Sequence, residues 1–143
     1  MKQKKKLYVG LSIIVVLLSF STLGSSITDD QTELEITSIK GGFGSATLEI
    51  ENVGTQTAVD IASSIKITGG LFNRIDLIHI CEGCSVCGST LSAGAIKSES
   101  SREAGFLLGF GPVTIQCTAS AKNADMVHYT AEGMLIGPLL IIN

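Results

Sequence analysis

The chain of 143 residues contains no tryptophan, only two prolines and few charged side chains, which make up 16% of the sequence. A disordered tail would combine high charge with low hydrophobicity, whereas 45% of these residues are hydrophobic. The 16 glycines are typical of short ordered segments joined by turns. The composition therefore predicts one small, turn-rich, ordered domain with its own core.

Basic residues are also scarce after the first six positions. The net charge of −3 includes Lys2, Lys4, Lys5 and Lys6, so the remainder of the chain is more acidic than the total indicates. Binding to nucleic acid requires a clustered basic face. The sequence therefore argues against a nucleic-acid partner.

Residues 1–26 have the layout of an export signal. The lysines precede a mostly apolar run at 7–23, and small residues follow at 24–26. The apolar run forms a hydrophobic helix close to the length of about 17 to 25 residues that spans a bilayer, so it is either a cleaved signal peptide or a retained anchor. No cysteine stands directly after the run, and no twin-arginine pair precedes it. We expect the domain at 27–143 to be extracellular or at the cell surface, with membrane contact only through this segment.

After Thr28, alternating apolar and polar residues predict about seven to nine short strands. Val113, Ile115, Cys117 and Ala119 alternate with polar residues in the clearest of them, so the Cys117 side chain should point into the core. Short strands separated by Gly, Asn and Ser turns predict an all-β, antiparallel β-sandwich, with a barrel as the alternative. The predicted strands fall at 32–39, 45–52, 59–68, 74–80, 95–100, 111–120 and 126–143.

The stretch LEIENVGTQTAVDI at 48–61 resembles the second strand, Asn-x-Gly turn and third strand of CARDB-type domains, which are named for cell adhesion in bacteria. The resemblance covers residues 34–123 and includes Asn52, Gly54 and Ala58. It implies an immunoglobulin-like sandwich that acts as an extracellular spacer or binding module without catalysis, with other cell-surface proteins or glycans as partners. The sequence departs from that pattern in a cysteine-bearing insertion at about 75–90.

Three of the four cysteines lie in HICEGCSVCGS at 79–89: Cys81, Cys84 and Cys87, with Cys117 the fourth. An even number of cysteines in an exported chain favours disulfides. Because Cys117 should face the core, we expect one cluster cysteine to cross-link to it, with Cys84 marginally preferred and Cys81 paired with Cys87. The alternative is a metal or thiol-redox site that uses Cys81, Cys84, Cys87, Cys117 and His79.

The positions of the remaining candidate residues are more typical of structural roles than of a reactive site. His79 and His128 lie in strand-like runs, and His79 shares a strand face with Cys81. Phe43, Phe106 and Phe110 could form an exposed aromatic lip, but packing in the core or against a hairpin is the more frequent arrangement.

No G-x-S-x-G elbow or phosphate-binding glycine loop occurs in the sequence. The sequence therefore predicts a non-enzymatic surface, structural or adhesion module without a cofactor. An exported metal-binding or thiol-redox protein is the alternative.

Overall fold

The computed structural model describes residues 31–82 and 90–143. The segment predicted as a signal peptide or anchor lies outside these residues, as do Cys84 and Cys87. Within them, none of the helical turns has the length and apolar character of a membrane-spanning helix.

The described chain folds into eight strands with two short 3-10 turns, η2 at Leu71–Asn73 and η3 at Ser101–Glu103. The prediction of an all-β, antiparallel chain is confirmed, although the third strand begins later than the pattern indicated and β4 occupies the first half of the presumed insertion. The strands are β1 (Leu34–Gly41), β2 (Ala46–Asn52), β3 (Ala62–Gly69), β4 (Ile75–Cys81), β5 (Ile96–Ser100), β6 (Gly109–Ala121), β7 (Ala124–Gly137) and β8 (Leu139–Ile142).

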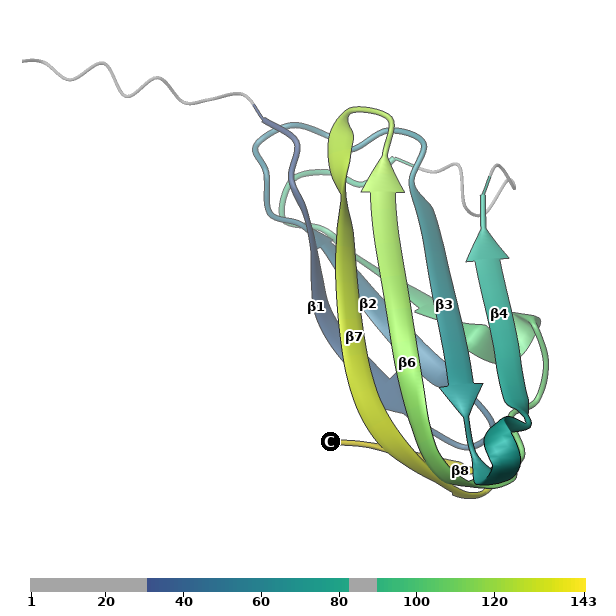
Figure 1. The fold of residues 1–143 in the computed structure, drawn as a ribbon. Helices are drawn as coiled ribbons and strands as arrows, with labels where there is room; N and C mark the ends of the chain where they lie inside the picture. The colour runs from purple at the N-terminus through teal and green to yellow at the C-terminus, as the bar shows by residue number, and fades with distance from the viewer. Residues whose placement is uncertain (1–30, 83–89) are drawn as a thin grey trace, which may run out of the picture.

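The strands form two antiparallel sheets that face one another (Figure 1). One sheet has three strands in the order β1-β2-β5, and the other has five in the order β4-β3-β6-β7-β8. The long hairpin of β6 and β7 runs the length of the larger sheet, and its turn lies at the same end as the start of β1. This end is called the N-terminal end below.

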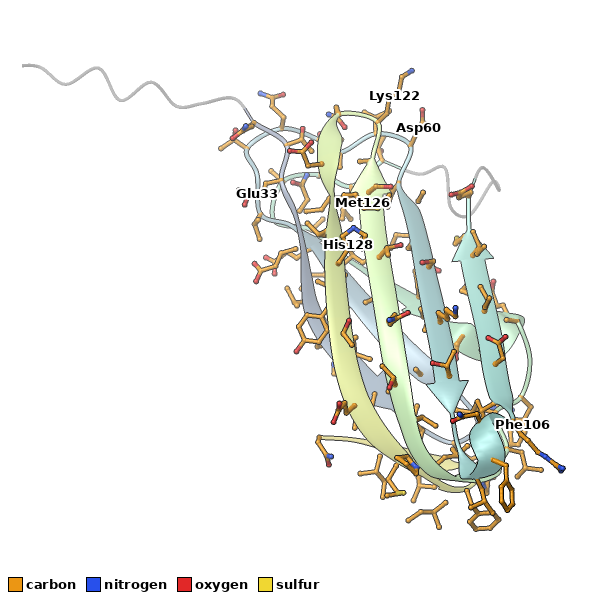
Figure 2. The ribbon with its side chains drawn as sticks, viewed as in Figure 1. Glu33, Asp60, Phe106, Lys122, Met126 and His128 are labelled. Atoms are coloured by element: carbon orange, nitrogen blue, oxygen red, sulfur yellow. The ribbon has the colours of Figure 1, made fainter. Side chains whose placement is uncertain are left out.

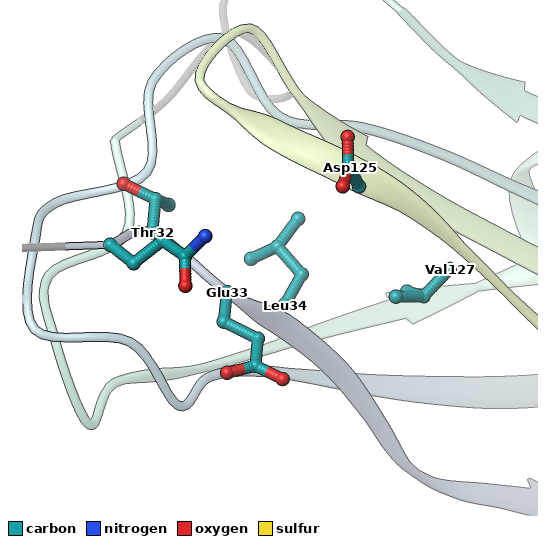
Figure 3. A pocket seen from close by; sticks show the side chains of 6 residues that line it. Thr32, Glu33, Leu34, Asp125 and Val127 are labelled. Carbon is teal, nitrogen blue, oxygen red and sulfur yellow. The ribbon is translucent and has the colours of Figure 1, made fainter. Parts of the chain in front are cut away.

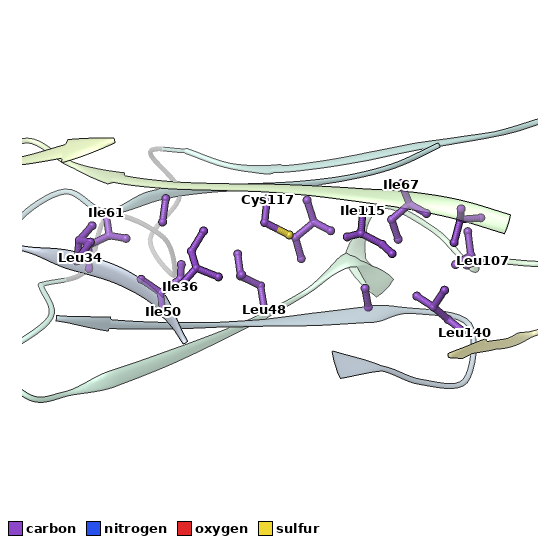
Figure 4. Packing of buried hydrophobic residues seen from close by; sticks show 14 of the residues in the cluster. Leu34, Ile36, Leu48, Ile50, Ile61, Ile67, Leu107, Ile115, Cys117 and Leu140 are labelled. Carbon is purple, nitrogen blue, oxygen red and sulfur yellow. The ribbon is translucent and has the colours of Figure 1, made fainter. Parts of the chain in front are cut away.

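The core between the sheets is built from aliphatic and small side chains that alternate along the strands (Figure 4). Ala46, Leu48 and Ile50 of β2 are completely buried, while the residues between them are only partly so. The predicted inward row of β6 is likewise buried, and the sulfur of Cys117 lies between the two layers (Figure 4). No phenylalanine belongs to this core within the described residues.

Short contacts between the sheets close the sandwich at its two ends. Leu139 of β8 forms an isolated bridge with Phe43, and the N–H of Leu140 donates to the carbonyl of Gly42 at 3.0 Å. At the N-terminal end, Ala58 and Leu91 exchange two backbone hydrogen bonds of 2.9 Å. The contacts of Leu139 and Leu140 thus attach strand β8 to the β1–β2 turn of the opposite sheet.

Asn52 fixes the loop that follows β2. Its side chain is fully buried, and its Nδ2 donates to the carbonyls of Gln56 at 2.7 Å and Leu91 at 2.8 Å, while Oδ1 accepts from the N–H of Gly54 at 3.1 Å. A Cβ atom at Gly54 would lie 2.4 Å from the carbonyl oxygen of Gln31, so only glycine fits there. The Asn-x-Gly sequence thus holds together three segments that are distant in the chain.

We predict that Asn52→Ala lowers the free energy of unfolding by about 1–3 kcal/mol, because the buried Asn52 amide loses its hydrogen bonds to the carbonyls of Gln56 and Leu91 and from the N–H of Gly54. Urea denaturation measures the change. The matched control is Gln116→Ala, which removes an exposed amide from β6 and should change stability by less than about 0.5 kcal/mol. Equal stability of the two variants would contradict the role assigned to Asn52.

Candidate functional site

Cys117 is a free thiol, contrary to the predicted cross-link. Its side chain is 1% exposed in the middle of β6, as the strand pattern predicted, and burial raises the pKa of the thiol to about 12. The expected disulfide between Cys117 and a cluster cysteine is therefore wrong. The physical reason is that Cys117 is already surrounded by the aliphatic core and packs there as a small apolar residue.

Cys81 has a different environment at the end of β4. It is buried, and it is not a free thiol. Its sulfur lies 3.8 Å from Oε1 of Glu99 on β5. Because Cys117 is free, no disulfide joins two cysteines within the described residues.

A strip of polar side chains fills the space between the edge strands β4 and β5. The carboxylate of Glu99 is almost fully buried and accepts from Nζ of Lys97 at 2.9 Å. His79 is 7% exposed, and its Nε2 is buried without a hydrogen-bond partner among the described residues. His79 and Cys81 share the inner face of β4, as predicted. Charged side chains that point inward from an edge strand also discourage pairing with other chains.

The polar strip does not by itself form a metal site. Across residues 31–82 and 90–143, no three His, Cys, Asp or Glu side chains are grouped so as to hold a metal ion. His128 is exposed on β7, on the opposite face of the sheet from Cys117. The ligand set considered from the sequence includes Cys84 and Cys87, which lie outside the described residues.

A pocket of about 240 Å³ lies at the N-terminal end, between the start of β1 and the start of β7 (Figure 3). Its lining combines two carboxylates, one amide and one hydroxyl with two aliphatic side chains. No polar side chain of this lining is buried without a partner. The residues are Gln31, Thr32, Glu33, Leu34, Asp125 and Val127.

The opposite end of the sandwich is apolar, and the expectation that the phenylalanines would be packed away is wrong. Phe43, Phe72, Phe106 and Phe110 are between 47% and 81% exposed. They include every phenylalanine after position 20. The labelled Phe106 lies at the opposite end of the molecule from Glu33 and Asp60 (Figure 2). The rings are excluded from the core because alternating aliphatic side chains already fill the space between the sheets.

These rings belong to one continuous surface. Phe43 and Phe106 meet edge to face with ring centroids 5.7 Å apart, and the guanidinium of Arg102 lies 5.1 Å from the Phe106 centroid. Phe43 bridges Leu139 of β8, which brings these aromatic rings to the end of the larger sheet. Six exposed apolar residues then continue across the outer face of β6, β7 and β8 in two cross-strand rows.

The rows follow from the strand register, because cross-strand partners lie on the same face of a sheet. Phe110 pairs with Ile136, which pairs with Leu139, and Pro112 pairs with Met134, which pairs with Ile141. We call the whole surface the apolar end. It consists of Phe43, Leu71, Phe72, Phe106, Leu108, Phe110, Pro112, Met134, Ile136, Leu139 and Ile141, all exposed.

The sequence analysis singled out Phe43, Phe106 and Phe110 but not Phe72, and it could not show which of these residues meet. Phe43, Phe72 and Phe106 lie in turns that are far apart in the chain, and only the sheet order brings those turns to one end. The signal that was available is the absence of phenylalanine from every alternating core run.

The comparisons with known proteins show a fold likeness. No family model matches the chain, and no curated protein matches its sequence. A solved structure titled the archaeal flagellum of Methanospirillum hungatei strain JF1 is similar with a TM-score of 0.52 at 12% identity, over 94% of this chain and 85% of that chain. A second structure, of an ApaA protein from Bordetella pertussis, has a TM-score of 0.44 at 17% identity, over 76% of this chain and 97% of that one.

We predict that Cys117 makes folding sensitive to alkaline pH. A thiol titrates near 9.0 in the unfolded chain and at about 12 in the core, so the folded state retains its proton over that interval. The free energy of unfolding should then fall as the pH rises from about 9 toward 12, whereas below 9 Cys117 adds no pH dependence.

Urea titrations at pH 8 and pH 10.5 for the wild type and Cys117→Ala test this prediction. The variant removes the thiol and should lose less stability between the two pH values than the wild type does. The subtraction cancels the contributions of the other side chains, which the two proteins share. Equal losses in the two proteins would show that the Cys117 thiol is not linked to folding.

Proposed function

We propose that this chain is an exported, non-catalytic structural or adhesion module of the cell surface. The observation that carries the proposal is the likeness of its fold, over most of both chains, to a structure from an archaeal flagellum, which is an extracellular assembly. The basic, apolar and small-residue order of residues 1–26 supports export on separate grounds. The immunoglobulin-like class that the CARDB resemblance implies agrees with two facing antiparallel sheets.

Such a module acts through its surface rather than through a reaction centre. Its described cysteines are buried, the ion pair of Lys97 and Glu99 lies at an open side of the sandwich, and exposed apolar side chains gather at one end. Its partners are other cell-surface proteins or glycans, and the N-terminal segment is its attachment to the membrane or its export signal.

Protease treatment of intact cells that express the full chain tests this proposal. We predict that an external protease degrades or releases the domain while a cytoplasmic marker in the same cells remains intact. The comparison is with cells expressing a chain in which Ile13, Ile14, Val15 and Val16 are replaced by aspartate, because charges in the apolar run prevent membrane insertion. Protection of the wild-type chain to the same extent as this variant would contradict export.

The cysteine cluster is assigned to a local disulfide in the same proposal. Cys81 is not free and Cys117 is, so we propose that Cys81 pairs with Cys84 or Cys87. A specific observation favours the metal or redox alternative: the unpartnered, buried Nε2 of His79 lies on the same strand face as Cys81. The two assignments predict different numbers of free thiols.

Intact-mass spectrometry with alkylation separates the two assignments. With a disulfide, we predict that the chain denatured without reductant takes up two alkyl groups, one on Cys117 and one on the unpaired cluster cysteine, and four after reduction. A metal site predicts four alkylated cysteines without reductant, together with a native mass that exceeds the chain by one metal ion. This second result would discard the disulfide.

A further inference from the structure

We propose that the apolar end is the surface through which two copies of this chain associate. Monomeric proteins rarely expose continuous apolar patches larger than a few hundred Å². Here eight of the eleven exposed apolar residues are connected by a ring contact, a β-bridge and the cross-strand rows of β6, β7 and β8. The turn that carries Leu71 and Phe72 lies against Gly111 of β6. The proposal rests on the chemistry of this surface, and only the exclusion of the N-terminal segment and of a lipid surface rests on the proposed function.

The backbone at Phe72 supports a binding role. Phe72 is the most exposed large apolar residue at 81%, and it adopts a left-handed conformation with φ 61° and ψ 25°. This conformation costs an aromatic residue roughly 1–2 kcal/mol, and glycine or asparagine would adopt it more readily. The Phe72 ring does little to offset that cost, because most of it is exposed. Strain of this kind is typical of residues that meet a partner.

The turn that carries Phe72 is held rigidly against the sheet. The N–H of Gly70 donates to the carbonyl of Pro112 at 2.7 Å, and the N–H of Asn73 donates to the carbonyl of Gly70 at 3.1 Å. Gly111 of β6 has φ 111°, and a Cβ atom there would lie 2.9 Å from the backbone nitrogen of Leu71. The Phe72 side chain is therefore presented by a fixed turn beside the row that begins at Phe110.

The N-terminal segment leaves the apolar end free for a second copy. The chain enters β1 at the N-terminal end, far from the apolar end (Figure 1). An apolar run at 7–23 that is cleaved, or that is inserted in a bilayer as an anchor, does not cover the apolar end of its own molecule. An anchor there would also hold the apolar end away from its own membrane, which disfavours a lipid surface.

The charges around the apolar end favour a second copy. Residues 31–143 contain six Lys or Arg and eleven Asp or Glu, so two copies repel each other at most orientations. Both arginines of the chain border the apolar end, together with acidic residues, and a two-fold pair can place each arginine near a carboxylate of the other copy. The exposed border residues are Arg74, Asp76, Arg102, Glu103 and Glu132.

The two rows on the outer face of β6, β7 and β8 are suited to a two-fold contact. The rows contain no charged side chain, so burying them against the same rows of a second copy leaves no unpaired charge. Sheets that pack face to face interdigitate such side chains at about 10 Å separation. A two-fold axis along the strands would join the rows of two copies and leave both N-terminal segments on the same side.

Sedimentation velocity of the full chain in a density-matched mild detergent tests the proposal. We predict a concentration-dependent monomer–dimer equilibrium and an increase in the dimer Kd of at least about tenfold for Ile136→Thr. Ile80→Thr is the matched control: Ile80 is 61% exposed on the outer face of β4, Ile136 is 51% exposed, and only Ile136 belongs to the apolar end. The control should change Kd by less than about twofold.

Phe72→Asn separates binding from folding. Asparagine accepts the left-handed backbone, so the melting temperature should stay the same or rise while the dimer Kd increases. A wild-type chain that is monomeric at every concentration would overturn the proposal. So would a dimer whose Kd is unchanged in both Ile136→Thr and Phe72→Asn, which would place the contact elsewhere. A monomer whose bound detergent decreases in Ile136→Thr would instead assign the apolar end to a lipid surface.

Discussion

The packing of aliphatic side chains between two antiparallel sheets is the constraint on which the other features depend. Rows such as Leu48 with Ile50 and Ile65 with Ile67 alternate inward from opposite sheets and pack against the other aliphatic side chains and Cys117. Because the space between the sheets is full, a ring or a charged group is accommodated only at an edge or an end. The phenylalanines are therefore exposed, and Glu99 and His79 lie in the gap between the edge strands β4 and β5.

The same constraint separates the two ends of the domain chemically. The N-terminal end carries Asn52 and its buried hydrogen bonds, the polar pocket and the junction with residues 1–30. The other end carries the aromatic turns and the apolar rows of β6, β7 and β8. With the proposed anchor in the N-terminal segment, a domain that the chain enters at one end and that is apolar at the other would present a contact surface at a distance from the membrane.

The sequence was sufficient to predict the strands and the inward rows, because both follow from a period of two residues. Val113, Ile115, Cys117 and Ala119 are buried as the alternation predicted, and the hairpin around residues 41–45 forms as expected. The pattern could not predict features that depend on the pairing of distant strands. These include the donation from Asn52 to Leu91, the meeting of Phe43 with Phe106, and the core packing that leaves Cys117 unpaired.

The two internal methionines offer the most direct test of an exported module whose apolar end is covered by a second copy. Met126 near the N-terminal end is 57% exposed and Met134 in the apolar end is 42% exposed, both on β7. We would treat intact cells with a membrane-impermeant oxidant and measure methionine sulfoxide at each position. The account predicts oxidation of Met126 with protection of Met134, and equal oxidation of both after Ile136→Thr. Equal oxidation in the wild type would contradict a covered apolar end, and protection of both methionines in the wild type and in Ile136→Thr would contradict export.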